Sequence, residues 1–285
     1  MLAFILVLSS SLCWTGIDLV RKLLAPRLDA LAMLVGLGLG FAIPLGLYGL
    51  LYAWPHGVPR VTAGYWVPGL ASLAINLFGN WLFVRALAIA PYSLVMPLLC
   101  LTPVFTTLLA IPVLHELPGP RQLGGVALIV AGALWLNWPE DARAWLNSRG
   151  SLYMLAVSLC WALVSPCDKL ATQASDPAFH GVFMNALMAL GYFLILAATG
   201  RAAALRDLRS NARLVGLGGL IGGAAIGLQL AALPLVMVSL FEAVKRMIGL
   251  VAAVVLGRAM FKEPVTPRKL AAIALMACGL AFVLL

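Results

Sequence analysis

The tetrapeptide SLCW occurs twice in the chain, at residues 11–14 and again at residues 158–161, which lie 147 positions later. In the same register, Asp29 aligns with Asp176. Four consecutive identical residues that include cysteine and tryptophan, two of the rarer amino acids, are unlikely to recur by chance. The repetition predicts that one structural unit is used twice and that the fold follows from this duplication.

The far ends of the two units agree as well. Segments 116–132 and 263–279 share seven identical residues at the same offset: Glu, Pro, Arg, Leu, Ala, Leu and Gly. We therefore expect a first repeat at 1–138, a polar linker at 139–150 and a second repeat at 151–285.

The composition predicts an integral membrane protein. Of 285 residues, 63% are apolar and 10% are charged, and the mean hydropathy is +1.04. Apolar stretches of about 18 to 23 residues recur, and about 20 helical residues cross a bilayer. The net charge of +9 does not indicate nucleic-acid binding, because the cations fall mostly in short gaps between apolar stretches.

Each repeat is predicted to contain five membrane-spanning helices. The ten expected spans are 2–20, 31–53, 66–88, 92–114, 121–138, 151–169, 178–198, 214–234, 238–257 and 269–285. Because five is odd, the second repeat enters the membrane from the opposite face. The fold class is therefore an all-α membrane protein of ten transmembrane helices in two inverted five-helix repeats. The N-terminal apolar segment lacks a basic region ahead of it, so we expect it to be the first span and not a signal peptide.

Small residues predict close helix packing. Gly219, Gly223 and Gly227 recur every four residues in the eighth span, and Gly36 and Gly40 do so in the second. Glycines at this spacing line one face of a helix, where a neighbouring backbone can approach closely.

The stretch FEAVKRM at 241–247 places three charged residues inside the ninth span. A charged side chain at the centre of a membrane helix costs about 2.5 to 3.5 kcal/mol on insertion scales. Glu242 precedes Lys245 by three residues and Arg246 by four, so it can pair with either cation on one helix face. One carboxylate can neutralise only one of the two cations.

We interpret the remaining positive charge as a counter-ion for an anionic substrate. An arginine fork and a lysine point charge suit a phosphate or a carboxylate. A purely structural ion pair is the competing interpretation. Other polar or aromatic residues that could line a substrate cavity are Asn76, Asn80, Trp81, Gln229, Trp14 and Trp161. Amides in membrane helices also serve helix–helix contacts, and tryptophans also serve packing.

No enzyme, metal or cofactor site is expected. HELPG at 115–119 has Gly119 where a zinc-protease helix needs its second histidine, and the five cysteines show no pairing pattern. The three histidines lie in or near expected loops, so a histidine proton relay is not predicted. The carboxylates placed to carry a coupling proton are Glu242, Asp18 and Asp168.

The two repeats end in the patterns "TPVF...E...PRQLGG...G" and "KRMIG...FKEPVTPRKL...G". By these patterns the repeats resemble the EamA-type domains of the drug/metabolite transporter superfamily, and the resemblance covers almost the whole chain. It implies a ten-helix basket in which the third, fourth, eighth and ninth helices surround a central cavity, while the fifth and tenth lie at the periphery.

A narrower resemblance concerns the ninth span. AVKRMIGLVAAVVLG at 243–257 is similar to the ninth helix of plastid triose-phosphate translocators, in the sugar-phosphate and nucleotide-sugar branch. This similarity implies that Lys245 and Arg246 grip a substrate phosphate. Those translocators carry another lysine in the fourth helix, where this chain has Leu98 to Leu101 ahead of Pro103. A bulkier anion, including a lipid-linked phosphate, therefore competes as substrate.

The cations also predict the orientation. Most of the 19 Lys and Arg residues fall in odd-numbered loops, which the positive-inside rule places in the cytoplasm with both termini outside. The superfamily resemblance implies the opposite, with both termini in the cytoplasm. A bacterial-type inner membrane is expected in either case.

The sequence thus predicts a secondary transporter that moves a small organic anion by alternating access. Export of amino acids or amphipathic metabolites is one alternative, and flipping of an anionic lipid carrier is another. We expect membrane lipids and an anionic small-molecule or lipid-linked substrate as partners, a proton as a candidate coupling ion, and no nucleic acid. Both a monomer and a homodimer are compatible with the sequence.

Overall fold

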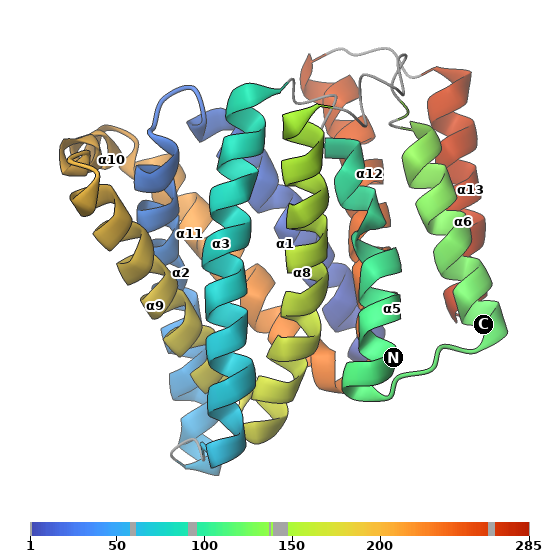
Figure 1. The fold of residues 1–285 in the computed structure, drawn as a ribbon, viewed down its shortest axis with the longest axis horizontal. Helices are drawn as coiled ribbons and strands as arrows, with labels where there is room; N and C mark the ends of the chain where they lie inside the picture. Colours follow the sequence, from blue (N-terminus) through green and yellow to red (C-terminus); the bar gives the residue numbers. More distant parts are fainter. Residues whose placement is uncertain are drawn as a thin grey trace. The chain divides into compact units, whose positions relative to one another are not determined.

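The computed structural model describes residues 2–57, 61–90, 96–136, 138, 148–261 and 266–284, and this part of the chain is helical without β-strands. Its α-helices are α1 (Leu2–Leu24), α2 (Ala30–His56), α3 (Trp66–Ile89), α5 (Thr102–Leu114), α6 (Pro120–Leu136), α8 (Arg149–Ala174), α9 (Pro177–Ala198), α10 (Asp207–Ser210), α11 (Ala212–Ala232), α12 (Val238–Phe261) and α13 (Pro267–Leu284) (Figure 1). Its 3-10 helices are η1 (Ala63–Tyr65), η2 (Met96–Leu101), η3 (Ala202–Arg206) and η4 (Leu233–Leu235).

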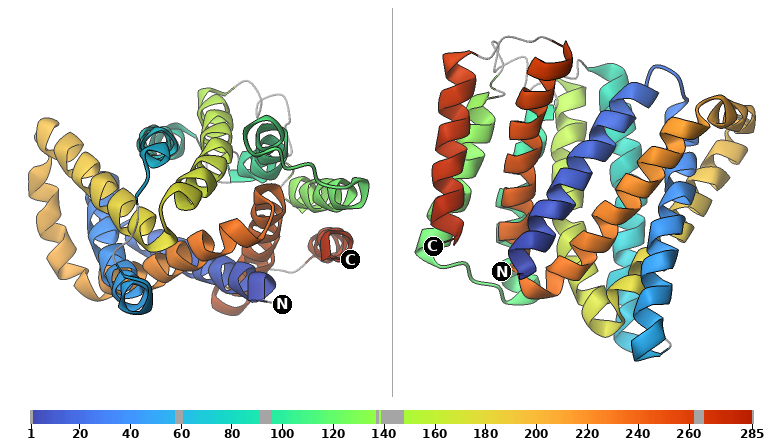
Figure 2. Two further views of the ribbon diagram at one scale, coloured as in Figure 1. Left: turned by 90° about the horizontal axis from the view of Figure 1, so that it is seen from below. Right: turned by 180° about the vertical axis from the view of Figure 1, so that it is seen from behind.

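The long helices occupy the ten predicted spans, and the four-residue α10 lies between the seventh and the eighth. This confirms the all-helical fold class. The fourth span is divided into η2 and α5, and the residues predicted to begin it, 92–95, lie outside the described part. Five helices of the described part are long and apolar enough to cross a bilayer: Leu2–Arg21, Ala30–Leu51, Arg149–Ala174, Pro177–Ala198 and Ala212–Leu235. The N-terminal segment is one of them, and α1 packs against α11 (Figure 2).

The helices form two compact units that both draw on the two halves of the chain. Unit 1 comprises Met1–Leu77 and Cys167–Leu235, and unit 2 comprises Phe78–Pro166 and Val236–Leu285. In unit 1, α2 packs against α9 and α11. In unit 2, α12 packs against α5 and α6, and α6 packs against α13.

The helices α6 and α13 of unit 2 occupy equivalent places in the two repeats and lie side by side (Figure 2). A Cβ atom added to Gly125 would lie 2.7 Å from the carbonyl oxygen of Gly279, and one added to Gly132 would lie 2.9 Å from that of Ala272. The repeat aligns Gly132 with Gly279 and Gly125 with Ala272. The contact of Gly125 with Gly279 is therefore equivalent to the contact of Ala272 with Gly132, with the roles of the two repeats exchanged. An early residue of each helix meets a late residue of the other, which makes the pair antiparallel. Antiparallel packing of equivalent helices is what an inverted repeat produces.

Unit 1 also relies on close approach of backbones. A Cβ atom added to Gly219 on α11 would lie 2.6 Å from the Cα atom of Gly40 on α2. One added to Gly223 would lie 2.2 Å from Cγ of Pro44. These contacts confirm the close packing predicted from the glycine spacing, because only residues without a Cβ atom fit at this distance. The neighbouring core contains Ile17, Val20, Leu24, Leu28, Leu37, Phe41 and Leu45.

The repeated aspartates start equivalent helices. The Oδ1 atom of Asp29 accepts hydrogen bonds from the backbone N–H groups of Leu31 (2.9 Å) and Ala32 (3.2 Å) at the start of α2. Asp176 is the N-cap of α9, and its Oδ1 atom accepts from the backbone N–H of Phe179 at 2.8 Å. A carboxylate satisfies N–H groups that the first helical turn leaves without partners. This shared task explains why both repeats carry aspartate at this position.

The contact between α6 and α13 can be tested with adjacent glycines of one helix. In Gly125→Ala the new methyl group meets backbone atoms of α13 that cannot rotate away, and we expect the free energy of unfolding to fall by about 1–3 kcal/mol. A Cβ atom at Gly124 meets nothing within 4 Å, so Gly124→Ala is the matched control. The measurement is unfolding of the purified protein in detergent. Equal stability of the two variants would contradict the close contact.

Candidate functional site

Glu242 lies inside unit 2 on α12 and pairs with Lys245. Its side chain is 2% exposed, and Oε1 accepts hydrogen bonds from Lys245 Nζ at 2.5 Å and from Ser165 Oγ of α8 at 2.8 Å. The Lys245 ammonium also lies 5.2 Å from the centre of the Phe241 ring. The ion pair, the hydroxyl and the ring together compensate the cost of burying this lysine.

Arg246 has a different environment. Its Nη2 atom donates to Thr102 Oγ1 at 3.5 Å, and its Cζ atom lies 5.9 Å from the centre of the Trp161 ring. Within the described residues, no carboxylate pairs with this guanidinium, and its buried Nε atom has no hydrogen-bond partner. A guanidinium has five N–H donors, so most of them are available to another ligand. The negative charge of Glu242 therefore neutralises Lys245, and the positive charge of Arg246 is not neutralised by a carboxylate of the described residues.

The groups around Arg246 are themselves held by unit 2. The Thr102 hydroxyl is buried at the start of α5, 3.0 Å from Ser158 Oγ of α8. The Trp161 ring lies 5.4 Å from the ring of Phe83 on α3. A Cβ atom added to Gly79 would lie 3.2 Å from the Cβ atom of Cys160, next to Trp161, so the glycine lets α3 pack closely against α8 here. A hydroxyl and an aromatic face can orient a guanidinium without neutralising it.

The structure brings Glu242, Lys245, Arg246 and Trp161 together and places the other predicted residues elsewhere. Asn80 lies on the part of α3 that belongs to unit 2. Three other predicted residues, Trp14, Gln229 and Asn76, belong to unit 1. Trp14 Nε1 donates to Gln229 Oε1 at 2.8 Å. Asn76 Nδ2 donates to the Ser72 hydroxyl at 3.3 Å. The hydrogen bond between Trp14 and Gln229 joins α1 to α11, so these two side chains serve helix–helix packing.

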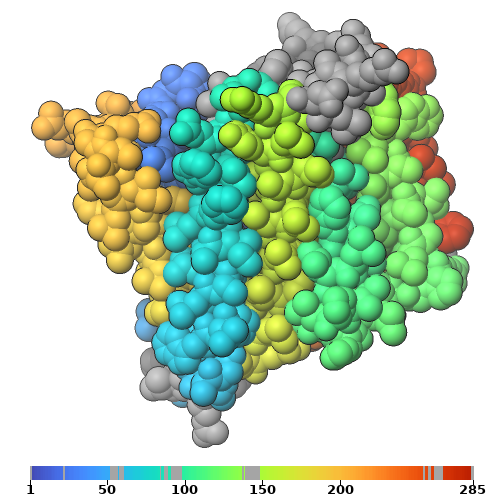
Figure 3. All heavy atoms as spheres, viewed as in Figure 1, coloured from blue at the N-terminus to red at the C-terminus, as the bar shows by residue number. Residues whose placement is uncertain are grey.

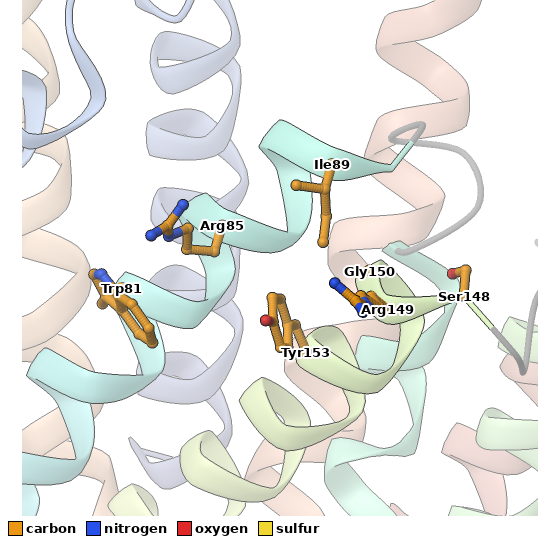
Figure 4. Close-up of a pocket in the computed structure, with 7 residues that line it drawn as sticks. All are labelled: Trp81, Arg85, Ile89, Ser148, Arg149, Gly150 and Tyr153. Atoms are coloured by element: carbon orange, nitrogen blue, oxygen red, sulfur yellow. The ribbon is translucent and has the colours of Figure 1, made fainter.

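Trp81 lines a pocket of about 480 Å³ at one end of α3 and α8 (Figure 4). Its indole stacks on Phe78 at 6.0 Å, and the Arg85 guanidinium lies 5.6 Å from its ring centre. The other lining residues are Ile89, Ser148, Arg149, Gly150 and Tyr153. The two helices lie side by side on the face shown in Figure 3. Neither Lys245 nor Arg246 lines this pocket, so it is separate from the ninth-span cluster.

His180, predicted to lie in or near a loop at the start of the 178–198 span, lies in the helix itself. Its side chain is 1% exposed in the first turn of α9, and its Nε2 atom lies 3.1 Å from Asp168 Oδ1. Asp176 followed by Pro177 is typical of an N-cap followed by the first helical residue, which agrees with the predicted start of this span. Sequence reasoning missed the hydroxyl groups of Thr102, Ser158 and Ser165, since serine and threonine are common in membrane helices and carry no distinctive spacing.

These observations define an all-helical, internally duplicated membrane protein with a cationic cluster in one helix. The model of the EamA-like transporter family matches the chain twice, over residues 1–138 and 148–285. The chain belongs to the EamA-like transporter family, within the drug/metabolite transporter superfamily. It is a multi-pass membrane transporter and not an enzyme.

Comparison with solved structures supports the fold alone. One crystal structure matches with a TM-score of 0.74 at 17% sequence identity, over 98% of this chain and 95% of the other chain. No curated protein matches the chain.

The ion pair on α12 can be tested by removing one partner and then both. Glu242→Gln leaves the Lys245 ammonium without its carboxylate, and we expect a loss of about 3–5 kcal/mol in the free energy of unfolding. The double variant Glu242→Gln/Lys245→Gln removes both charges and should recover most of that loss. Chemical unfolding in detergent measures both variants. A double variant as unstable as Glu242→Gln would contradict the pairing.

Proposed function

We propose that the chain is a secondary transporter that moves a small organic anion, carrying a phosphate or carboxylate group, across a bacterial-type inner membrane. The observation that supports this function is the asymmetry on α12. Lys245 shares the Glu242 carboxylate, whereas Arg246 contacts only a hydroxyl and an aromatic ring within the described residues. A guanidinium fork binds phosphate or carboxylate through short, charge-assisted hydrogen bonds.

In this proposal Arg246 is the primary anion contact and Lys245 is a secondary one. The Lys245 side chain is 18% exposed, so its ammonium can contribute to the field around the anion while it remains bonded to Glu242. The similarity of 243–257 to the ninth helix of triose-phosphate translocators supports phosphate as the preferred group. Leu98 and Leu99, which stand where those translocators carry a lysine, are apolar and buried, so they supply no second positive charge.

Loss of the Arg246 charge should abolish the preference for anions. In Arg246→Gln, we expect phosphorylated or carboxylated metabolites to bind about 10- to 100-fold more weakly, because one charge-assisted contact contributes about 1.5–3 kcal/mol. Thermal-shift screening of the purified protein against matched phosphorylated and neutral metabolites measures this effect. Arg206→Gln, at an exposed site on η3, removes the same charge and serves as the control.

Two results would contradict the proposal. Equal anion-induced shifts in wild type and Arg246→Gln would remove Arg246 from the site. Shifts produced by neutral amino acids or amphipathic metabolites would favour an exporter of such compounds, and shifts confined to lipid-linked phosphates would favour a lipid flippase. The charge-matched variant Glu242→Gln/Lys245→Gln keeps the net charge of the cluster and should still discriminate anions from neutral compounds.

For the orientation we propose that the odd-numbered loops face the cytoplasm. In a variant without the five native cysteines, a cysteine at Arg206 should resist a membrane-impermeant maleimide in intact cells and react after permeabilisation. A cysteine introduced beside Arg121, in an even-numbered loop, should show the reverse pattern. Reaction of the first cysteine in intact cells would place both termini in the cytoplasm instead, as the superfamily resemblance implies.

A further inference from the structure

A second polar cluster lies inside unit 1, on residues that the proposed anion site does not use. His180 Nε2 lies 3.1 Å from Asp168 Oδ1, and His180 Nδ1 lies 3.2 Å from the hydroxyl of Tyr65. The Ser72 hydroxyl donates to the same carboxylate oxygen, Asp168 Oδ1. Four residues from η1, α3, α8 and α9 are thus joined in one chain of hydrogen bonds.

The cluster is almost completely shielded from solvent. Tyr65 and Ser72 are 0% exposed, His180 is 1% exposed and Asp168 is 8% exposed. Three aromatic rings surround the Tyr65 ring, with Phe179 at 5.2 Å, Trp66 at 5.5 Å and Phe183 at 6.0 Å. An ionised carboxylate in such surroundings needs hydrogen-bond donors and a positive counter-charge.

The contacts are geometrically compatible with two protonation states of the imidazole. When His180 is neutral, its Nε2–H donates to Asp168 and its Nδ1 accepts from the Tyr65 O–H. When His180 is protonated, both ring nitrogens donate, and the Tyr65 oxygen becomes the acceptor. A hydroxyl can donate or accept by rotating its hydrogen. A proton can therefore bind or leave while every heavy atom keeps its partner.

Other titratable groups on the surrounding elements modify this balance. Lys169 and Cys167 flank Asp168 on α8, and the Asp176 carboxylate caps α9 one turn before His180. Burial and the negative charge of Asp168 raise the pKa of Tyr65 well above its usual range, so the phenol keeps its proton at neutral pH. On the part of α3 in unit 1, the Ser72 hydroxyl donates to Asp168 and accepts from the Asn76 amide, and neither side chain is titratable.

We propose that Asp168, His180 and Tyr65 form a binding site for one exchangeable proton. Uptake of the proton by His180 converts a buried carboxylate with neutral partners into a neutral ion pair, which changes the charge of the cluster by one unit. Secondary transporters use such a change to couple two conformations to an ion gradient. This coupling role rests on the proposed transport function, whereas proton binding itself does not.

Proton binding can be measured directly on the full chain. The protein, labelled with ¹⁵N-histidine and reconstituted in lipid nanodiscs, is titrated between about pH 5 and pH 8, where histidine protonation is expected. The sequence has three histidines, so His56→Gln and His115→Gln assign the signal of His180 by elimination. We expect the His180 ring to change from two protonated nitrogens to one in this range. A ring that keeps one protonation state throughout would overturn the proposal.

Two variants test the roles of the partners. Asp168→Asn preserves the size of the side chain but removes the counter-charge of the imidazolium, and we expect the His180 ring to stay neutral over the same range. Tyr65→Phe removes only the hydroxyl that pairs with His180 Nδ1. We therefore expect the ¹⁵N signal of His180 Nδ1 to differ from that of the wild-type protein. Titration in Asp168→Asn identical to wild type would contradict the ion pair.

Coupling needs a separate readout. Coupling is measured in proteoliposomes that contain a pH-sensitive dye. When a phosphorylated metabolite from the thermal-shift screen is added, the wild-type protein should change the internal pH, and Asp168→Asn should not. Asp168→Asn should keep the anion-induced thermal shift, because Arg246 is unchanged. No difference in proton movement between the two proteins would overturn the coupling role. Loss of the thermal shift in Arg246→Gln, but not in Asp168→Asn, separates the anion site from the proton site.

Discussion

Charge inside an apolar helix is tolerated only where a polar partner lies within reach, and this constraint decides where chemistry can occur in the protein. The membrane helices contain few ionisable groups, and the two buried carboxylates described within helices, Glu242 and Asp168, each have a cation or an imidazole beside them. Arg246 differs because, among the residues that the structure describes, its partners are a hydroxyl and a ring. Two buried clusters of different composition follow from one energetic rule.

The duplication supplies the framework for these clusters. Each compact unit contains helices of both halves, and equivalent helices pack antiparallel through small residues, as at Gly125 and Gly279. The close approach depends on backbone atoms and leaves little freedom for adjustment. The charged residues of the ninth span, in contrast, are not repeated. Glu242, Lys245 and Arg246 have no charged counterparts in the fourth span, although Trp161 beside Arg246 belongs to the repeated SLCW.

Much of the fold could be predicted because hydrophobic length and repeat register are local properties. The apolar stretches predict the long helices, and Asp29 and Asp176 mark the starts of equivalent helices through hydrogen bonds to residues two or three positions away. The same kind of local signal places His180 in the first turn of α9, within the predicted span 178–198. The pairing of Glu242 with Lys245 was within reach for the same reason, since three residues separate them on one helix.

What the sequence by itself determined is the all-helical, duplicated architecture and the presence of one more cation than carboxylate in the ninth span. Only the tertiary structure decided which cation is paired with the carboxylate and which is not. Ser165 of α8 contacts Glu242 and Thr102 of α5 contacts Arg246, and both residues are far from the ninth span in the sequence. The tertiary structure also decided that Asp168, His180 and Tyr65 meet. Contacts of this kind depend on how helices pack, and packing is set by the combined shapes of many side chains, which no single spacing in the sequence records.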